Sequence, residues 1–359
     1  MLNSLQAGRA FAALAVVVFH LSPMFGKKEY GGIAFWEGYT SLGYLGVDFF
    51  FALSGFIILA AHYSDLGRPG RLGVYLVKRF IRIYPLYWLI TGIVIGGAWL
   101  TSGAVTLPSG LTDVASMMSL VHLNAYRTPV LPAWTLFHEV FFYALMGLAI
   151  WNRLYGVVAL VAWALLLLIV NVMLPDMQQH AGAFLRMVMF PGNLAFFGGL
   201  GAYLIYRVAG KKQAAIWSLS GFSVFLVLLT TFDSPDNVFL FKACLALAFA
   251  GIIGGVAALE KNGYVLDMRI LTEIGNASFM LYLTHGNIQT WSMKFFHRLF
   301  PAFASQHRML VYLAVVAACL LFSLAAHRWV EKPLLRYLRN RLLPRPGGPR
   351  QPVDQTLPA

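Results

Sequence analysis

Apolar runs long enough to cross a lipid bilayer recur along almost the whole chain, and this leaves few folds open to it. A helix needs about 20 apolar residues to cross the hydrocarbon core, where lipid cannot bond to exposed backbone groups. Ten such runs are present, at residues 5–23, 41–61, 83–101, 119–150, 154–174, 184–206, 214–232, 238–259, 274–295 and 309–330. The sequence therefore predicts an all-α polytopic membrane protein, with about ten transmembrane helices around a central cavity.

The charged residues are few and lie unevenly along the chain. They make up 11% of it, against about 25% in soluble proteins. With the N-terminus in the cytosol, 19 of the 27 Lys and Arg fall on the cytosolic side. The positive-inside rule then predicts that both termini are cytosolic and accounts for the net charge of +13 without a nucleic-acid partner. Residues 1–340 are expected to form the transmembrane domain, and the Pro-rich, basic stretch 341–359 a disordered tail.

Motifs for common cofactors do not occur in the chain. Its two cysteines, Cys244 and Cys319, both fall inside predicted spans, where they are expected to be small core residues. The sequence holds no His/Cys cluster with zinc spacing, no phosphate-binding P-loop and no dinucleotide fingerprint. We therefore expect no metal, and the sequence leaves the oligomeric state open.

Arg9 and His20 are eleven residues apart in the first apolar run. At about 100° per residue, eleven steps bring both side chains to one helix face, about 16 Å apart along the axis. Ionisable groups inside a membrane helix are costly unless they line a wet or functional cavity. The simpler alternative is that Arg9 extends to the cytosolic headgroups while His20 ends the helix near the outer interface. The shared face favours a functional pair.

A second basic pattern is RPGRLGVYLVKRFIRIYPLYW at residues 68–88. Arg79 and Arg82 are three apart on what we expect to be a short helix at the cytosolic surface, so both can point at one target. Two guanidinium groups on one face suit a diphosphate, because each can form bidentate bonds to phosphate oxygens. A positive-inside loop that binds anionic lipid headgroups explains the same residues.

Two carboxylates lie inside apolar runs, where each needs a partner or a cavity. Asp48, in YLGVDFFFALSGFII, can orient His20 as an acid does in a catalytic triad, or it can form a structural ion pair. Its candidate partners are Arg9, His20 and the arginines of the 68–82 loop. Glu139, in PAWTLFHEVFFYALM, is predicted to face a cavity or to pair with a basic group. Trp134, near the start of the same segment, is a candidate for the cavity wall.

The C-terminal third of the chain adds three candidates. Tyr282 and His285, in SFMLYLTHG, are three apart on the ninth predicted span and are expected to be neighbours that line the same cavity. Glu331, in HRWVEKPLLRYLR, ends the last span beside Lys332. A glutamate at the end of a helix beside basic residues usually forms an interfacial ion pair, so from the residues alone its role is structural.

Six segments, in this order, resemble the membrane-bound acyltransferase-3 family, bacterial enzymes that O-acylate extracytoplasmic sugars. They are Arg9 with His20, GVDFFFALSGFII at 46–58, Arg79-Phe80-Ile81-Arg82 with IYPLYW, PAWTLFHEVFFY at 132–143, SFMLYLTHG at 278–286 and VEKP at 330–333. The chain looks most similar to members that modify exopolysaccharides. Gly286-Asn287 departs from the family, which often has a proline shortly after this histidine. The glutamate matching Glu331 is also implicated in the family.

The resemblance implies roles for several residues. In the family, the histidine that matches His20 is regarded as the catalytic base, the arginine that matches Arg9 supports it, and the arginines that match Arg79 and Arg82 are assigned to the phosphates of acyl-CoA. We assign Tyr84, in the adjoining IYPLYW, to the same donor site. The co-substrate implied is acyl-CoA, most simply acetyl-CoA. The acceptor implied is a saccharide or a lipid-linked saccharide, and the location implied is the bacterial cytoplasmic membrane.

A proton-coupled transporter or exporter of an envelope precursor is the competing class. Such proteins also carry His, Glu and Asp within their spans, where these residues form proton relays. However, the chain has no internal repeat of the kind from which many transporters are built, and Arg79 and Arg82 are predicted to lie outside the membrane core. The sequence leaves open which sugar hydroxyl and which acyl group are used, and whether transfer is direct or passes through an acyl-enzyme.

Overall fold

The structure is a computed structural model that describes residues 2–32, 35, 37–100, 108–126, 128–231, 237–264 and 268–343. Within these residues the chain forms helices and no strand, which confirms the all-α prediction. The predicted disordered tail lies outside the described residues from position 344 onward.

The helices differ widely in length. In the first half they are α1 (Asn3–Phe25), α2 (Glu37–Thr40), α3 (Leu45–His62), α4 (Leu72–Leu100), α5 (Leu111–Ser119), α6 (Trp134–Trp151) and α7 (Arg153–Met173). The second half holds α8 (Met177–His180), α9 (Ala183–Val188), α10 (Leu194–Val208), α11 (Lys211–Thr231), α12 (Val238–Lys261), α13 (Arg269–Asn276), α14 (Ser278–Leu299), α15 (Pro301–Gln306), α16 (Arg308–Ala326) and α17 (Lys332–Leu342).

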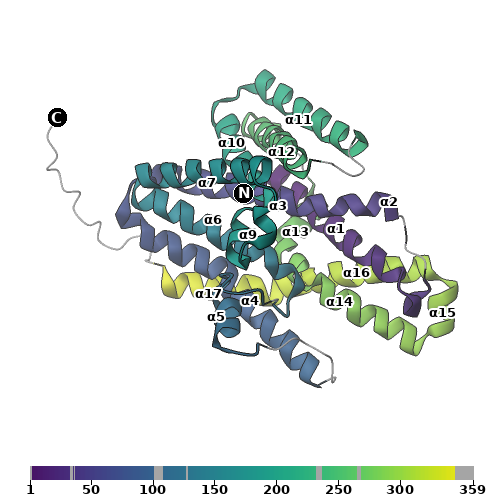
Figure 1. The fold of residues 1–359 in the computed structure, drawn as a ribbon. Helices are drawn as coiled ribbons and strands as arrows, with labels where there is room; N and C mark the ends of the chain where they lie inside the picture. The colour runs from purple at the N-terminus through teal and green to yellow at the C-terminus, as the bar shows by residue number, and fades with distance from the viewer. Residues whose placement is uncertain are drawn as a thin grey trace, which may run out of the picture.

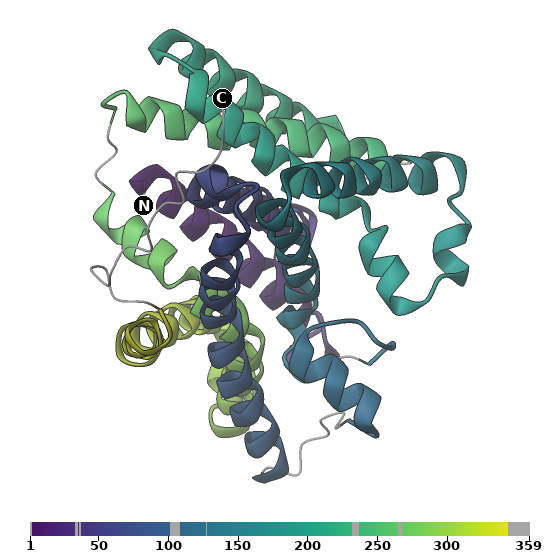
Figure 2. The same ribbon diagram turned by 90° about the vertical axis from the view of Figure 1, so that its left-hand side faces the viewer.

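These helices form a bundle with two distinct sides. Figures 1 and 2 show α10, α11 and α12 along one side and α16 with α17 along the opposite side, while α1 and α3 lie between them. Glycines allow the central helices to approach closely. A Cβ atom added at Gly199 of α10 would overlap the Ala52 carbonyl of α3, and one at Gly55 would overlap the Phe196 carbonyl. Small residues at such crossings are typical of membrane helices.

Eight segments of the described chain are long and apolar enough to cross a membrane: Asn3–Phe25, Ser41–Asp65, Pro69–Trp99, Leu131–Trp151, Arg153–Met173, Lys211–Thr230, Val238–Lys261 and Arg308–Leu342. The protein is thus a multi-pass membrane protein, but the predicted count of ten is not confirmed. The predicted span 184–206 is divided between α9 and α10, and α10 has only 15 residues. The predicted span 274–295 corresponds mainly to α14, which has 22 residues but carries His285, Gln289 and Lys294.

The prediction of a separate surface helix around Arg79 and Arg82 is wrong. Both residues lie in α4, which runs without a break from Leu72 to Leu100 and passes through Pro85. Proline removes one backbone hydrogen bond, a loss that helices packed within a membrane bundle tolerate. A helix of 29 residues is longer than the about 20 needed to cross the hydrocarbon core, so it is long enough for several residues to extend beyond the core.

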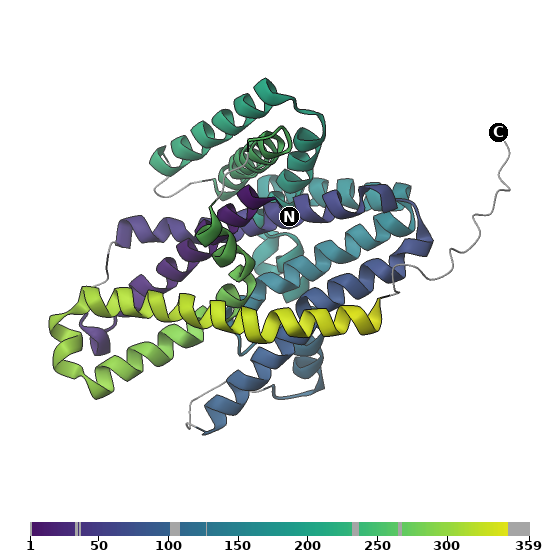
Figure 3. The same ribbon diagram turned by 180° about the vertical axis from the view of Figure 1, so that it is seen from behind.

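A similar extension ends the described chain. α16 continues into α17 through a π-helical turn, His327–Glu331, so that the two helices form one long rod (Figure 3). π turns are rare and frequently occur at functional sites. Here the turn buries the side chain of Glu331, which is only 1% exposed.

Candidate active site

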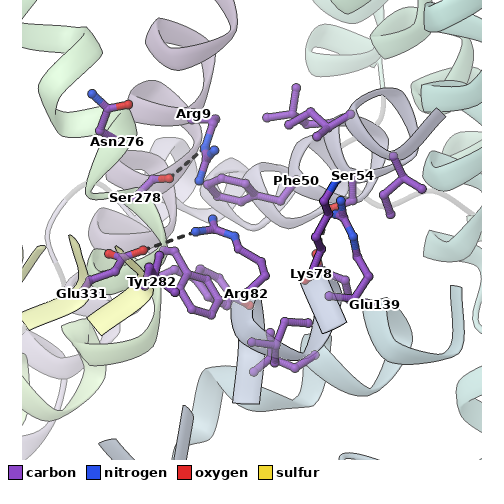
Figure 4. A pocket seen from close by; sticks show the side chains of 18 of the residues that line it. Arg9, Phe50, Ser54, Lys78, Arg82, Glu139, Asn276, Ser278, Tyr282 and Glu331 are labelled. Atoms are coloured by element: carbon purple, nitrogen blue, oxygen red, sulfur yellow. Dashed lines mark hydrogen bonds and ion pairs between the residues drawn. The ribbon is translucent and has the colours of Figure 1, made fainter. Parts of the chain in front are cut away.

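A cavity of about 880 Å³ opens within the bundle (Figure 4). Its wall includes side chains from α1, α3, α4, α6, α14, the π turn and α17. Seven Lys or Arg side chains and two Glu side chains line it: Arg9, Lys78, Arg79, Arg82, Lys332, Arg336, Arg339, Glu139 and Glu331. The excess of positive charge suits a ligand that carries several negative charges.

Arg9 is buried in the wall of this cavity, and its Nε donates a hydrogen bond to the Ser278 hydroxyl at 3.0 Å (Figure 4). It lies among the charges of Arg82, Glu331 and Glu139. The side chain is therefore enclosed by protein groups rather than extended along the outside of α1, as the alternative of a headgroup contact requires.

The buried carboxylate of Glu331 joins two elements of the wall. Arg82 Nη1 donates to Oε1 at 3.3 Å, and His327 Nδ1 lies 2.8 Å from Oε2 across the π turn. The Arg82 guanidinium also lies 4.7 Å from the ring centre of Phe279. A carboxylate buried without such partners would carry a large desolvation penalty. Glu331 therefore fixes Arg82 of α4 against the start of α17.

Arg79 also lines the cavity, and its contacts are separate from those of Arg82. Its Nη2 donates to His62 Nε2 at 3.3 Å, and His62 Nδ1 donates to Asp65 at 2.8 Å. The guanidinium lies 5.4 Å from the ring centre of Tyr143. Arg79 and Arg82 therefore line one cavity, as their spacing predicts, but separate partners position them.

Glu139 faces the same cavity from α6. Its Oε1 accepts a hydrogen bond from the Tyr143 hydroxyl, one turn along the helix, and another from the Ser54 hydroxyl of α3 at 3.3 Å. The prediction that this glutamate faces a cavity is confirmed. The two hydroxyl donors keep its carboxylate satisfied inside the bundle.

Comparison with known protein families matches residues 2–328 to an acyltransferase domain. The chain belongs to this family. It is a member of the acyltransferase-3 group that the sequence motifs indicate, and it is an O-acyltransferase.

Several curated proteins are similar to this acyltransferase over most of its length. Exopolysaccharide production protein ExoZ of Rhizobium meliloti (strain 1021) is 27% identical, covering 84% of this chain and 92% of its own. Acyltransferase MdmB of Streptomyces mycarofaciens is 26% identical, covering 95% of this chain and 93% of its own. O-acetyltransferase OatA of Staphylococcus aureus (strain NCTC 8325 / PS 47) is 21% identical over 93% of this chain, which spans 57% of OatA. No solved structure matches.

His20 of the acyltransferase lies outside the cavity, beside His285. His20 Nδ1 is 3.3 Å from His285 Nε2, and the ring centres are 5.0 Å apart. His20 Nδ1 also lies 2.9 Å from the Val16 carbonyl, and His285 Nδ1 lies 2.7 Å from the Tyr282 carbonyl. Because a carbonyl only accepts, each Nδ1 is assigned the hydrogen of a neutral ring. His20 Nε2 is then the basic nitrogen.

Tyr282 lies at the cavity wall and is also a neighbour of this histidine pair. It lines the cavity, and its hydroxyl donates to Thr135 Oγ1 at 3.0 Å, linking α14 to α6. Its ring centre lies 6.0 Å from that of His285 and 5.9 Å from that of Phe50. Tyr282 and His285 are neighbours as predicted, but Tyr282 lines the cavity while His285 contacts His20 behind it.

Three other predicted site residues of the acyltransferase lie away from the cavity wall. Asp48 binds Lys242 of α12 at 2.7 Å, with both side chains buried, so the predicted partners Arg9, His20 and the loop arginines are wrong. The Tyr84 hydroxyl donates to the Ser119 carbonyl at 2.7 Å. Trp134 is 42% exposed and packs against His138 and Phe190.

Sequence reasoning missed several residues that hold this site together. Lys242 carries a detectable signal, because it is a lone cation in a predicted span and must have a partner. Ser278 and His62 carry none, because a serine at a helix start and a histidine at a helix end are common. Arg336 and Arg339 look like the basic end of any last span, and only the position of α17 brings them to the cavity.

Proposed function

We propose that the acyltransferase moves an acyl group, most simply acetyl, from cytosolic acyl-CoA to a hydroxyl of an extracytoplasmic or lipid-linked saccharide. Its location is the bacterial cytoplasmic membrane, with both termini in the cytosol. The observation that carries this proposal is the basic cavity, whose wall includes Tyr282, a neighbour of the His20–His285 pair. The basic cavity fits an anionic acyl donor, and the histidine pair fits an acceptor hydroxyl that is activated by a base.

Acyl-CoA suits the cavity by charge and by shape. Its phosphates carry negative charge, which balances the excess of positive charge in the cavity lining. Guanidinium groups bind phosphate oxygens in bidentate pairs. Arg79 and Arg82 are the proposed ligands of its diphosphate. The narrow, uncharged pantetheine arm then extends past Arg9 towards Tyr282, and it brings the thioester to the side of the cavity nearest His20.

His20 is the proposed general base. Its Nε2 takes the proton of the acceptor hydroxyl while the hydroxyl oxygen attacks the thioester carbonyl carbon. The tetrahedral intermediate collapses, the carbon–sulfur bond breaks, and the thiolate of CoA leaves. The proton held by His20 is then released to the thiolate, which gives free CoA thiol and the neutral base. Val16 and His285 hold the opposite ring nitrogen, so that Nε2 keeps its lone pair. Tyr282 and Thr135 have to part for the thioester to reach His20.

The proposed acceptor rests on similarity to relatives. ExoZ is named for exopolysaccharide production and OatA for O-acetyl transfer. His20 is exposed, whereas Arg9 at the other end of its face is buried within the cavity wall. A bulky saccharide can reach an exposed base more easily than one enclosed in a bundle. This favours an acceptor that approaches from the side opposite to the donor.

The direct test is acyl transfer by the purified full chain in lipid nanodiscs. With [¹⁴C]acetyl-CoA and an envelope saccharide, we expect label in the saccharide and release of free CoA thiol. Mass spectrometry of envelope polysaccharide from cells with and without the protein identifies the acceptor. If CoA is neither bound nor consumed while a proton gradient drives export of an envelope precursor, the protein is a transporter and the proposal is wrong.

The proposed sidedness is tested separately by thiol labelling. Lys28 lies in the exposed turn after α1, and Arg71 lies just before α4 with its side chain 61% exposed. Lys28→Cys and Arg71→Cys are made singly in a background that lacks Cys244 and Cys319. A membrane-impermeant thiol reagent on intact cells is expected to label position 28 only. Labelling of position 71 alone inverts the topology and contradicts a cytosolic donor.

A further inference from the structure

The polar helix α17 presents one basic face to the cavity. Lys332, Arg336 and Arg339 line the cavity, and their spacings of four and three residues place them on the same side of the helix. Arg341 lies off this face and does not line the cavity; its guanidinium is 5.8 Å from the ring centre of Tyr337. The helix therefore separates its arginines into a pair at the cavity and a neighbour outside it.

The cations of this face differ from Arg82 in their ion pairing. Within the described part of the chain, no carboxylate forms an ion pair with Lys332, Arg336 or Arg339. Arg82 deeper in the cavity differs, because Glu331 already pairs with it. A cluster of like charges along a cavity repels itself, and an anion bound between the charges relieves this repulsion.

The basic residues of the cavity occupy two levels. The inner level is the Arg82–Glu331 pair. Along α17, Arg336 and Arg339 follow Glu331 by five and eight residues, or about 7.5 and 12 Å. Figures 1 and 3 show the end of α17 and the start of α4 at the same end of the molecule, so Lys78 lies on the outward side of Arg82 as well.

We propose that Arg336 and Arg339 bind the 3′-phosphate on the ribose of CoA, so that the enzyme selects a 3′-phosphorylated nucleotide as its acyl donor. This inference rests on the proposed function. In CoA the diphosphate lies between the pantetheine arm and the nucleoside, and the 3′-phosphate lies on the far side of the diphosphate from the thioester. A diphosphate at the inner level therefore directs the 3′-phosphate towards the outer level.

The chemistry of the outer level fits a phosphate monoester. Such a group is close to dianionic at neutral pH and has three terminal oxygens, so two guanidinium groups three residues apart can each bind it through two N–H donors. An acyl group carried on a protein-bound phosphopantetheine has a single phosphodiester and no such group. The outer level therefore gives the enzyme a means to distinguish soluble acyl-CoA from an acyl carrier protein.

The test compares CoA with 3′-dephospho-CoA, which differs by this one phosphate. The full chain in zwitterionic nanodiscs is titrated with each ligand by calorimetry. Charge-assisted bonds of this kind predict that the wild type binds CoA about 10- to 100-fold more tightly. The Arg336→Gln/Arg339→Gln variant is expected to bind both ligands with the affinity that the wild type has for 3′-dephospho-CoA. Arg341→Gln is the matched control and is expected to keep the wild-type ratio.

The possible outcomes separate this inference from the proposed function. If the wild type binds both ligands equally, the inference is wrong and the proposed function stands; if it binds neither, both fall. If Arg341→Gln loses the preference for CoA over 3′-dephospho-CoA to the same extent, the preference comes from diffuse electrostatic attraction and not from a specific site. An anionic lipid headgroup offers the same phosphate chemistry, so the titration is repeated in nanodiscs with anionic lipid. If the double variant changes only its response to that lipid, and not the ratio of the two affinities, the face binds headgroups instead.

Discussion

The two ends of the shared face of α1 have opposite surroundings. Arg9 is buried, bonds to Ser278 and lines a cavity rich in positive charge. His20, eleven residues on, is exposed, lies outside that cavity and contacts His285. Both partners lie on α14, so the same pair of helices forms both environments. The cavity end has cationic groups that suit anion binding, and the other end has two imidazoles that suit proton transfer.

Under the proposed function, this difference lets one helix pair serve two substrates that meet only at the boundary between the two ends. We place this boundary at Tyr282, because it lines the cavity and its ring lies near that of His285. If the division holds, substitutions at the His20 end abolish transfer without weakening donor binding, whereas substitutions at the cavity end weaken donor binding first. The experiments that follow can break or sharpen this division.

The largest effect is expected from His20→Ala. Loss of a general base lowers the rate by about 10²- to 10⁴-fold. Because His20 does not line the cavity, the affinity for acetyl-CoA is expected to stay within about twofold of the wild type. Transfer is measured with [¹⁴C]acetyl-CoA and affinity by calorimetry. His180→Ala, at an exposed histidine of α8, is the control. Near wild-type transfer by the His20 variant rules out its role as base.

Substitutions at Asp48 test whether its ion pair with Lys242 is structural or forms a third functional region beside the two ends of α1. If its ion pair with Lys242 is structural, Asp48→Ala leaves a buried lysine without its partner and lowers stability by about 3–5 kcal/mol. The double variant Asp48→Leu/Lys242→Met is expected to recover most of this stability and full transfer. Thermal unfolding in detergent measures the first effect and acyl transfer the second. A stable double variant without activity assigns Asp48 a catalytic role after all.

The cavity end is tested by Arg82→Ala, which is expected to weaken acetyl-CoA binding by about 10- to 100-fold, because a charge-assisted bond to phosphate is lost. Arg82→Lys restores this only in part, since an ammonium group cannot replace the bidentate fork. Arg71→Ala is the matched control, because Arg71 lies outside the cavity and is 3.9 Å from Asp65. Equal losses at both positions point to general electrostatic attraction instead of a site.

The sequence predicted what depends on local spacing and missed what depends on distant packing. Helical periodicity put Arg9 and His20 on one face, and in the structure both contact α14. Periodicity has no information on the partner of Asp48, which lies 194 residues away on α12. The wall between cavity and histidines depends on how the Tyr282 side chain meets Thr135 of another helix, and no pattern within one segment encodes that contact.

The smallest effect, and the most specific to the boundary, is expected from Tyr282→Phe. The variant keeps the ring but loses the hydrogen bond to Thr135, which contributes about 1 kcal/mol, or about a fivefold change in how often the boundary opens. In the absence of acceptor, water then reaches the thioester more often, so acetyl-CoA hydrolysis should rise about fivefold while acetyl-CoA affinity stays unchanged. Thr135→Val removes the same bond from the other side and should act alike.

Because Tyr282→Phe and Thr135→Val remove the same interaction, the double variant should hydrolyse acetyl-CoA no faster than either single variant. Additive effects, or a loss of acetyl-CoA affinity in Tyr282→Phe, would make Tyr282 a donor-binding residue and move the boundary closer to His20.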